Sequence, residues 1–191
     1  MKKCHARTFC LAVALLAAIA FCPSAALAGT ITIEVPAGPV TVGSFFDVFV
    51  EIADVTDLYA FEFDLGFDPL ILRADSVTEG SFLAGSGTTS FISGTIDNSG
   101  GSITYIANSL TGSGPGVTGD GSLVGIRLQA LAAGPSSLTL SEVILLDSDL
   151  SDIGFTTRDG SITVAGNAVP EPCTMVLLCS GLIGMASIRR K

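Results

Sequence analysis

The sequence predicts an all-β sandwich, of the jelly-roll kind, over residues 29–165. Apolar and polar side chains alternate along successive short segments, which is the pattern of strands with one buried face. Clusters of Gly, Ser, Asn and Pro separate these segments, as turns do between the strands of a sandwich. No part of this region shows a sustained helical period. These observations together favour two packed sheets over any helical or mixed architecture.

Nine strands are expected in this region. The alternation is clearest in 46–52, 59–67 and 124–130, where each strand has one apolar and one polar row. Weaker runs predict strands at 30–35, 71–77, 89–96, 102–108, 137–146 and 161–164. The Gly-rich segment Leu110–Ser122 is interpreted as a surface loop within one domain, because neither side of it alone has enough strands for a stable sandwich.

Charge and residue usage exclude several functions. The chain has 191 residues and a net charge of −9, yet 17 of its 18 acidic residues lie within 29–169, against only Arg73, Arg127 and Arg158. A region with a net charge of −14 repels phosphate backbones, so nucleic-acid binding is not expected. The same region contains no His, Cys or Lys, which removes a Ser-His-Asp triad, a Cys nucleophile and a Cys/His zinc site. We therefore expect no catalytic residues and no enzyme.

Residues 1–28 resemble a secretory signal peptide. A basic start is followed by an apolar run over 9–21, and Ala26 and Ala28 provide the small side chains that a signal peptidase needs. The expected cleavage is before Gly29. An uncleaved membrane anchor and a lipoprotein attached at Cys22 are the alternatives.

The C-terminal segment is a second apolar run, residues 173–188, followed directly by a basic end. A helix of this length would extend about 24 Å, somewhat short of the hydrocarbon core of a bilayer. Basic residues after an apolar run stay on the cytoplasmic side. Because the N-terminus is expected to be exported, the sequence predicts transient anchoring in the inner membrane with the body of the protein outside.

The residues of this tail closely resemble the PEP-CTERM sorting signal. The resemblance rests on a short motif, an apolar run and a basic end in that order, and its residues are Val169, Pro170, Glu171, Pro172, Arg189, Arg190 and Lys191. It implies recognition by an exosortase of a Gram-negative bacterium, removal of the tail, and display at the cell surface or release into the extracellular matrix. A plain single-span anchor is the alternative. The three parts of the chain are thus a signal peptide (1–28), a sandwich domain (29–165) and a sorting tail (166–191).

The order of motifs in the sandwich resembles the cohesin family. Phe67-Asp68-Pro69 is followed by Glu79-Gly80, then by the Gly-rich segment 111–121 before 123–128, and by a closing strand at 160–164. The resemblance covers about residues 30–165. It implies a nine-stranded jelly roll related to carbohydrate-binding modules, and a non-covalent partner of the dockerin type, whose calcium belongs to the dockerin.

The same resemblance implies which sheet face would bind a partner. The candidate residues are Ala60, Glu62 and Asp64 on one strand, together with Thr104 and Asn108, or the opposite row, on another strand whose register the sequence leaves open. Glu62 and Asp64 could also suggest a glycosidase, but side chains two apart on a strand point the same way and do not flank a sugar. Solvation of a charged strand face is the alternative reading of this row.

Two weaker hypotheses concern ligands. Asp147, Asp149 and Asp152 crowd one turn and could hold a weak structural calcium, although solvated turn acids are the favoured interpretation. Phe49 falls on the polar row of its strand and is the aromatic residue available for stacking on a glycan. The predicted function is therefore an exported binding module, with a carbohydrate-binding module or a passive component of the extracellular polymer as alternatives.

Overall fold

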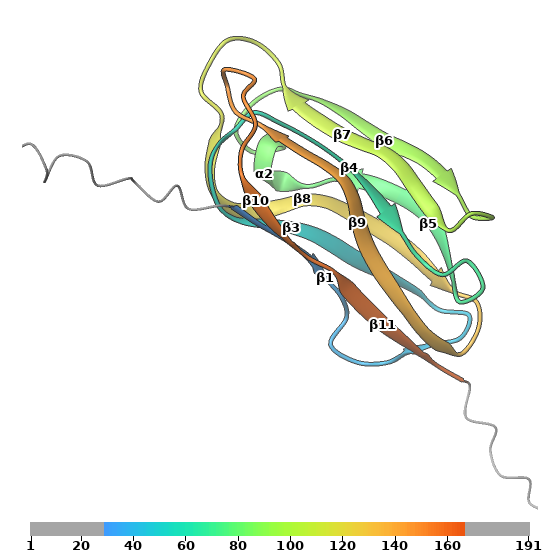
Figure 1. Cartoon of the computed structure of the whole chain (residues 1–191). Coiled ribbons are helices and arrows are strands. Elements are labelled where there is room, and N and C mark those ends of the chain that lie inside the picture. Colours follow the sequence, from blue (N-terminus) through green and yellow to red (C-terminus); the bar gives the residue numbers. More distant parts are fainter. Residues whose placement is uncertain (1–28, 167–191) are drawn as a thin grey trace, which may run out of the picture.

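The computed structural model describes residues 29–166, which form two β-sheets packed face to face (Figure 1). The first, here called sheet I, has the strand order β10-β1-β3-β8-β5. Its strands are β10 (Phe155–Arg158), β1 (Gly29–Glu34), β3 (Phe45–Leu58), β8 (Val117–Ala130) and β5 (Leu72–Glu79). The predicted sandwich is thus confirmed.

The second sheet, here called sheet II, has the order β2-β11-β9-β4-β7-β6. Its strands are β2 (Val40–Thr41), β11 (Gly160–Ala165), β9 (Gly134–Leu146), β4 (Ala60–Gly66), β7 (Ser102–Leu110) and β6 (Thr89–Asp97). One short helix, α2 (Ser81–Ala84), lies between β5 and β6 in sequence and buries Phe82 and Leu83. Each of the nine predicted strands overlaps an observed one, and β2 and β10 are additional.

The predicted loop Leu110–Ser122 is wrong over its second half. Residues 117–122 form the start of β8 and pair with the end of β3, where Gly119 lies opposite Val55 and Gly121 opposite Ile52. A Cβ on Gly121 would stand 2.8 Å from the ring of Phe82, so the glycine leaves room for α2. The high glycine content therefore reflects close packing on a strand as well as a loop.

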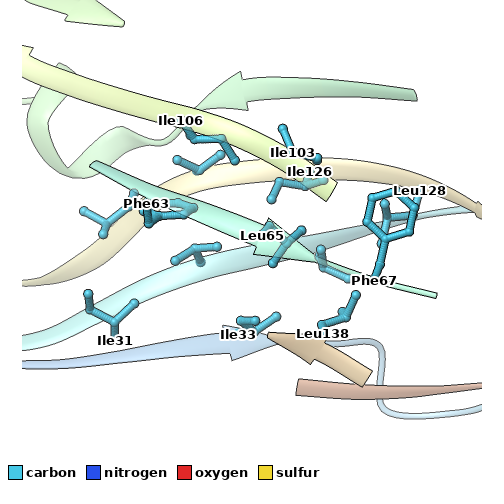
Figure 2. Packing of buried hydrophobic residues seen from close by; sticks show 14 of the residues in the cluster. Ile31, Ile33, Phe63, Leu65, Phe67, Ile103, Ile106, Ile126, Leu128 and Leu138 are labelled. Carbon is cyan, nitrogen blue, oxygen red and sulfur yellow. The ribbon is translucent and has the colours of Figure 1, made fainter. Parts of the chain in front are cut away.

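The core fills the space between the two sheets. The inward rows of β4 and β7 supply Phe63, Leu65, Ile103 and Ile106, all fully buried (Figure 2). From sheet I, β8 supplies the buried Ile126 and Leu128. The alternation in the sequence is thus explained by rows that face each other across the sandwich.

Tyr59 is half-buried and lies between β3 and β4. Its hydroxyl donates a hydrogen bond to the Gly112 carbonyl and holds the loop 111–116. Within residues 29–166, no helix has the length and apolar character needed to span a bilayer. The predicted signal peptide and sorting tail lie outside the described residues.

Candidate binding face

The predicted row on β4 faces outward. Ala60, Glu62 and Asp64 are half-buried and alternate with the buried Phe61 and Phe63. Because β4 is paired on both sides, with β9 and β7, this row lies in the middle of the sheet II surface.

The predicted row on β7 is only partly correct, because a bulge shifts its alternation. Thr104 and Tyr105 are both exposed between two buried isoleucines, and Tyr105 has a positive φ of 61°. The backbone N–H of Tyr105 donates a 2.7 Å hydrogen bond to Oδ1 of Asp64. One extra residue on a strand moves every later side chain to the other face. Thr104 therefore lies on the outward surface, but Asn108 does not.

Asn108 faces the interior and is 3% exposed, so it cannot contact a partner on the outward face. Its Nδ2 donates a 2.8 Å hydrogen bond to Oε1 of Glu79, which also accepts the hydroxyl of Thr89. These contacts connect β7 with the end of β5 and the start of β6. Within residues 29–166, Oδ1 of Asn108 has no hydrogen-bond partner. The role of Asn108 is to join the two sheets at this edge.

The strand register places three apolar residues in one row with Glu62 across sheet II. On β4, Glu62 pairs with Ile144 of β9 on one side and with Ala107 of β7 on the other. Ala107 in turn pairs with Ile92 of β6. Ile144 and Ile92 are each 43% exposed, and Tyr105 is 53% exposed beside them. Sequence reasoning missed these three residues, because their outward positions depend on bulges and on the pairing between strands.

The charge on this face has one sign. Asp64 and Glu142 join Glu62 on the outward side of β4 and β9. Each of the three arginines within residues 29–166 lies on a strand of sheet I, not of sheet II. We call this surface, formed by Ile92, Tyr105, Ile144, Ala107, Glu62 and Asp64, the acidic face.

The calcium hypothesis is not supported by the geometry. Oδ1 of Asp147 accepts hydrogen bonds from the backbone N–H groups of Asp149 and Ser151, as in an ordinary turn. Among the described residues, no three or more acidic, His or Cys side chains gather to hold a metal ion. The carboxylate of Asp147 therefore holds this turn, and Asp152 follows it in an isolated β-bridge with Leu146.

Asp57 has a defined structural role at the same end of the molecule. The Ser148 hydroxyl donates a 2.6 Å hydrogen bond to its Oδ2, and the backbone N–H of Gly116 donates to Oδ1. These donors, with the Ser148 hydroxyl contributing most, lower the pKa of Asp57 from its ordinary value of 3.8. The carboxylate thereby ties the end of β3 to two loops.

Phe49 lies on the outward side of sheet I, as predicted, and is 45% exposed. It faces Gly125 of β8, and a Cβ on that glycine would stand 3.3 Å from Cε1 of the ring. The ring therefore lies across the glycine, and one side of it remains open to solvent.

Comparison with known proteins identifies both parts of the chain. The cohesin domain model matches residues 29–164, and the PEP-CTERM protein-sorting motif matches residues 168–191. The PEP-CTERM motif indicates export and sorting to the cell envelope or surface of Gram-negative bacteria. A search of curated proteins found no match.

Solved structures agree on the fold. A non-cellulosomal cohesin from the archaeon Archaeoglobus fulgidus is 19% identical, with a TM-score of 0.60 over 74% of this chain and 94% of that one. A type II cohesin from Acetivibrio cellulolyticus is 15% identical, with a TM-score of 0.60 over 71% and 95%. A type I cohesin–dockerin complex from Clostridium thermocellum is 15% identical, with a TM-score of 0.57 over 72% and 99%.

The two-sheet arrangement of the strands and these matches all indicate a cohesin fold. The chain belongs to the cohesin domain family and carries a PEP-CTERM sorting motif at its C-terminal end.

Proposed function

We propose that this protein is an exported binding module that captures a dockerin-like partner through the acidic face, and that an exosortase sorts it through its tail. The observation that carries the proposal is the outward row of Ile144, Glu62, Ala107 and Ile92, flanked by Tyr105. The relatives that contain a dockerin support a protein as the partner class.

The chemistry of the face suits a protein partner. Exposed isoleucines on β9 and β6 and a tyrosine on β7 supply apolar area across the sheet, and the acids between them favour a partner with basic residues. Aromatic side chains are enriched among the residues that dominate binding energy at interfaces. Residues 29–166 contain no histidine, cysteine or lysine, so recognition without chemistry is the proposed mode of action.

Capture of dockerin domains encoded in the same genome tests the partner. The protein, produced from the full chain in an exporting host, is expected to retain a dockerin in the presence of calcium. Glu62→Arg should reduce the affinity by roughly tenfold or more, because it reverses the charge at the centre of the face. Glu51→Arg, also half-buried but on sheet I, is the matched control and should leave capture unchanged.

Equal capture by the wild type and Glu62→Arg would show that another face binds. Absence of capture of every dockerin would leave the passive matrix component as the better account of the protein.

The proposed sorting has its own test. Mass spectrometry of the surface or released protein should find an N-terminus at Gly29 and no C-terminal residues 189–191. A mature protein that ends at Lys191 in the released fraction would contradict processing by an exosortase.

A further inference from the structure

The outward face of sheet I differs in charge from the rest of the molecule. Arg73 on β5, Arg127 on β8 and Arg158 on β10 all belong to this face, and they are all exposed. The outward rows of β1 and β3 add three acids, Glu34, Asp47 and Glu51, with Asp75 at a register shift on the edge strand. Two further acids, Asp54 near the end of β3 and Asp120 near the start of β8, are exposed at one end of this sheet. Away from that end, positive and negative charges nearly cancel, whereas every charged side chain on the remaining surface of residues 29–166 is acidic.

Two aromatic rings stand on this face. Phe45 and Phe49 are 47% and 45% exposed, and they lie on the same side of β3. β3 is the central strand of sheet I (Figure 1). Four residues along a strand separate the two phenylalanines by roughly 13 Å. Neither ring contributes to the core, so the packing of the sandwich does not explain them.

Both rings are held against the sheet. The ring of Phe49 lies across Gly125, where a Cβ would stand only 3.3 Å from Cε1 of the ring. The guanidinium carbon of Arg127 stands 5.4 Å from the centre of the Phe45 ring, and Arg127 also contacts Asp47 at 3.7 Å. An exposed ring that is already oriented loses little conformational entropy when it binds a ligand.

We propose that this face, formed by Phe45, Phe49, Gly125, Arg127, Gln129 and Arg73, binds an uncharged polysaccharide. The rings would stack on the C–H faces of sugars, and the guanidinium, amide and carboxylate groups would hydrogen-bond to hydroxyls. The site goes beyond the proposed capture of a dockerin, because it lies on the other sheet.

The charge distribution decides the class of ligand. A cationic polymer would bind the acid-only surfaces of the molecule in preference to this face, and those same surfaces repel an anionic polymer. An uncharged chain is neither attracted nor repelled by those surfaces, and it can bind around the two rings, where Arg73 and Arg127 nearly balance Asp47 and Asp75. The ion pair between Asp47 and Arg127 separates the two rings, so the surface lacks the continuous apolar centre of a protein interface.

Affinity electrophoresis tests this proposal. The protein produced from the full chain is run through gels that contain hydroxyethylcellulose, xyloglucan, galactomannan or dextran, and through one that contains alginate as the anionic comparison. At least one neutral polymer should retard the wild type. The double variant Phe45→Ala/Phe49→Ala should lose affinity by on the order of tenfold per ring.

The double variant Ile92→Ala/Ile144→Ala is the matched control, since it removes side chains of similar exposure from the acidic face, and it should be retarded like the wild type. Thermal unfolding checks that each variant is folded. If the phenylalanine double variant fails to fold, Phe45→Gln alone, which keeps Phe49 over Gly125, decides the question. The proposal is overturned if no neutral polymer retards the wild type, if alginate alone does, or if the folded phenylalanine variants are retarded unchanged.

Discussion

At the scale of single residues, the side of the sheet on which a polar side chain lies decides whether it can bind a partner or only stabilise the fold. Glu62 and Asn108 were both predicted as partner contacts, but only Glu62 is on the surface. The side-chain amide of Asn108 instead donates a hydrogen bond to the carboxylate of Glu79, between the two sheets. Substitutions at these two positions should therefore affect different properties of the protein.

Asn108→Ala should lower the free energy of unfolding by about 1–3 kcal/mol, because Glu79 loses a donor in a part-buried position. Affinity for the captured partner should be unchanged. Urea denaturation and partner titration measure the two quantities, and Ser109→Ala, on the neighbouring outward position, is the control that should change stability little. Lost affinity with unchanged stability would mean that Asn108 contacts the partner after all.

Asp57 makes the stability of the protein depend on pH. Its pKa is lowered in the folded protein, chiefly by the Ser148 hydroxyl. The ionised carboxylate therefore contributes stability above its ordinary pKa of 3.8, and this contribution is lost as the pH falls below that value and through the lowered pKa.

Asp57→Asn should be less stable than the wild type in urea denaturation at about pH 6, and the difference should shrink toward about pH 3. A difference that stayed constant, or grew, on acidification would show that the charge of Asp57 does not hold the loops.

At the scale of elements, alternation predicted the strands, and bulges limited the prediction of their faces. The outward row of β4 follows directly from its sequence, since the buried phenylalanines leave Glu62 and Asp64 on the other side. The bulge at Tyr105 depends on pairing with β4, where Asp64 accepts its N–H, and no local pattern in β7 reveals it. The row from Ile144 to Ile92 likewise depends on the register of four strands.

Segments without a clear period were also missed. β2 has two residues and β10 has four, too few for a period to be recognised. The start of β8 has the composition of a loop, and only its pairing with the far end of β3 makes it a strand. Long-range pairing is thus the physical information that the sequence patterns lacked.

The turn between β6 and β7 shows how closely elements approach each other. Gly101 has a positive φ of 73°, and a Cβ there would stand 2.3 Å from the Phe67 carbonyl oxygen. Gly43 has a positive φ of 88° but open space around it. The first glycine is therefore needed both for its backbone angle and for its lack of a side chain, and the second only for its angle.

Gly43→Ala should cost about 1–2 kcal/mol from left-handed strain. Gly101→Ala should cost more than that, because backbone atoms must also move apart. Urea denaturation of both variants gives the comparison. Equal losses of stability would show that the contact with Phe67 is relieved without cost.

At the scale of the whole molecule, one core supports two outward faces of different character. The acidic face on sheet II offers isoleucines, a tyrosine and acids, whereas sheet I offers two phenylalanines among balanced charges. The sandwich keeps the faces on opposite sides, because each sheet buries its other side in the shared core. A partner protein and a polysaccharide could therefore be bound at the same time by a module sorted to the cell surface.

The most direct measurement is a calorimetric titration of a captured dockerin with two variants, whose substituted residues are almost equally exposed in the wild type. Ile144→Arg changes the acidic face of sheet II, and Phe49→Arg changes the outward face of sheet I. Our account predicts that Ile144→Arg abolishes binding while Phe49→Arg binds like the wild type. Binding that survives Ile144→Arg and is lost in Phe49→Arg would contradict it.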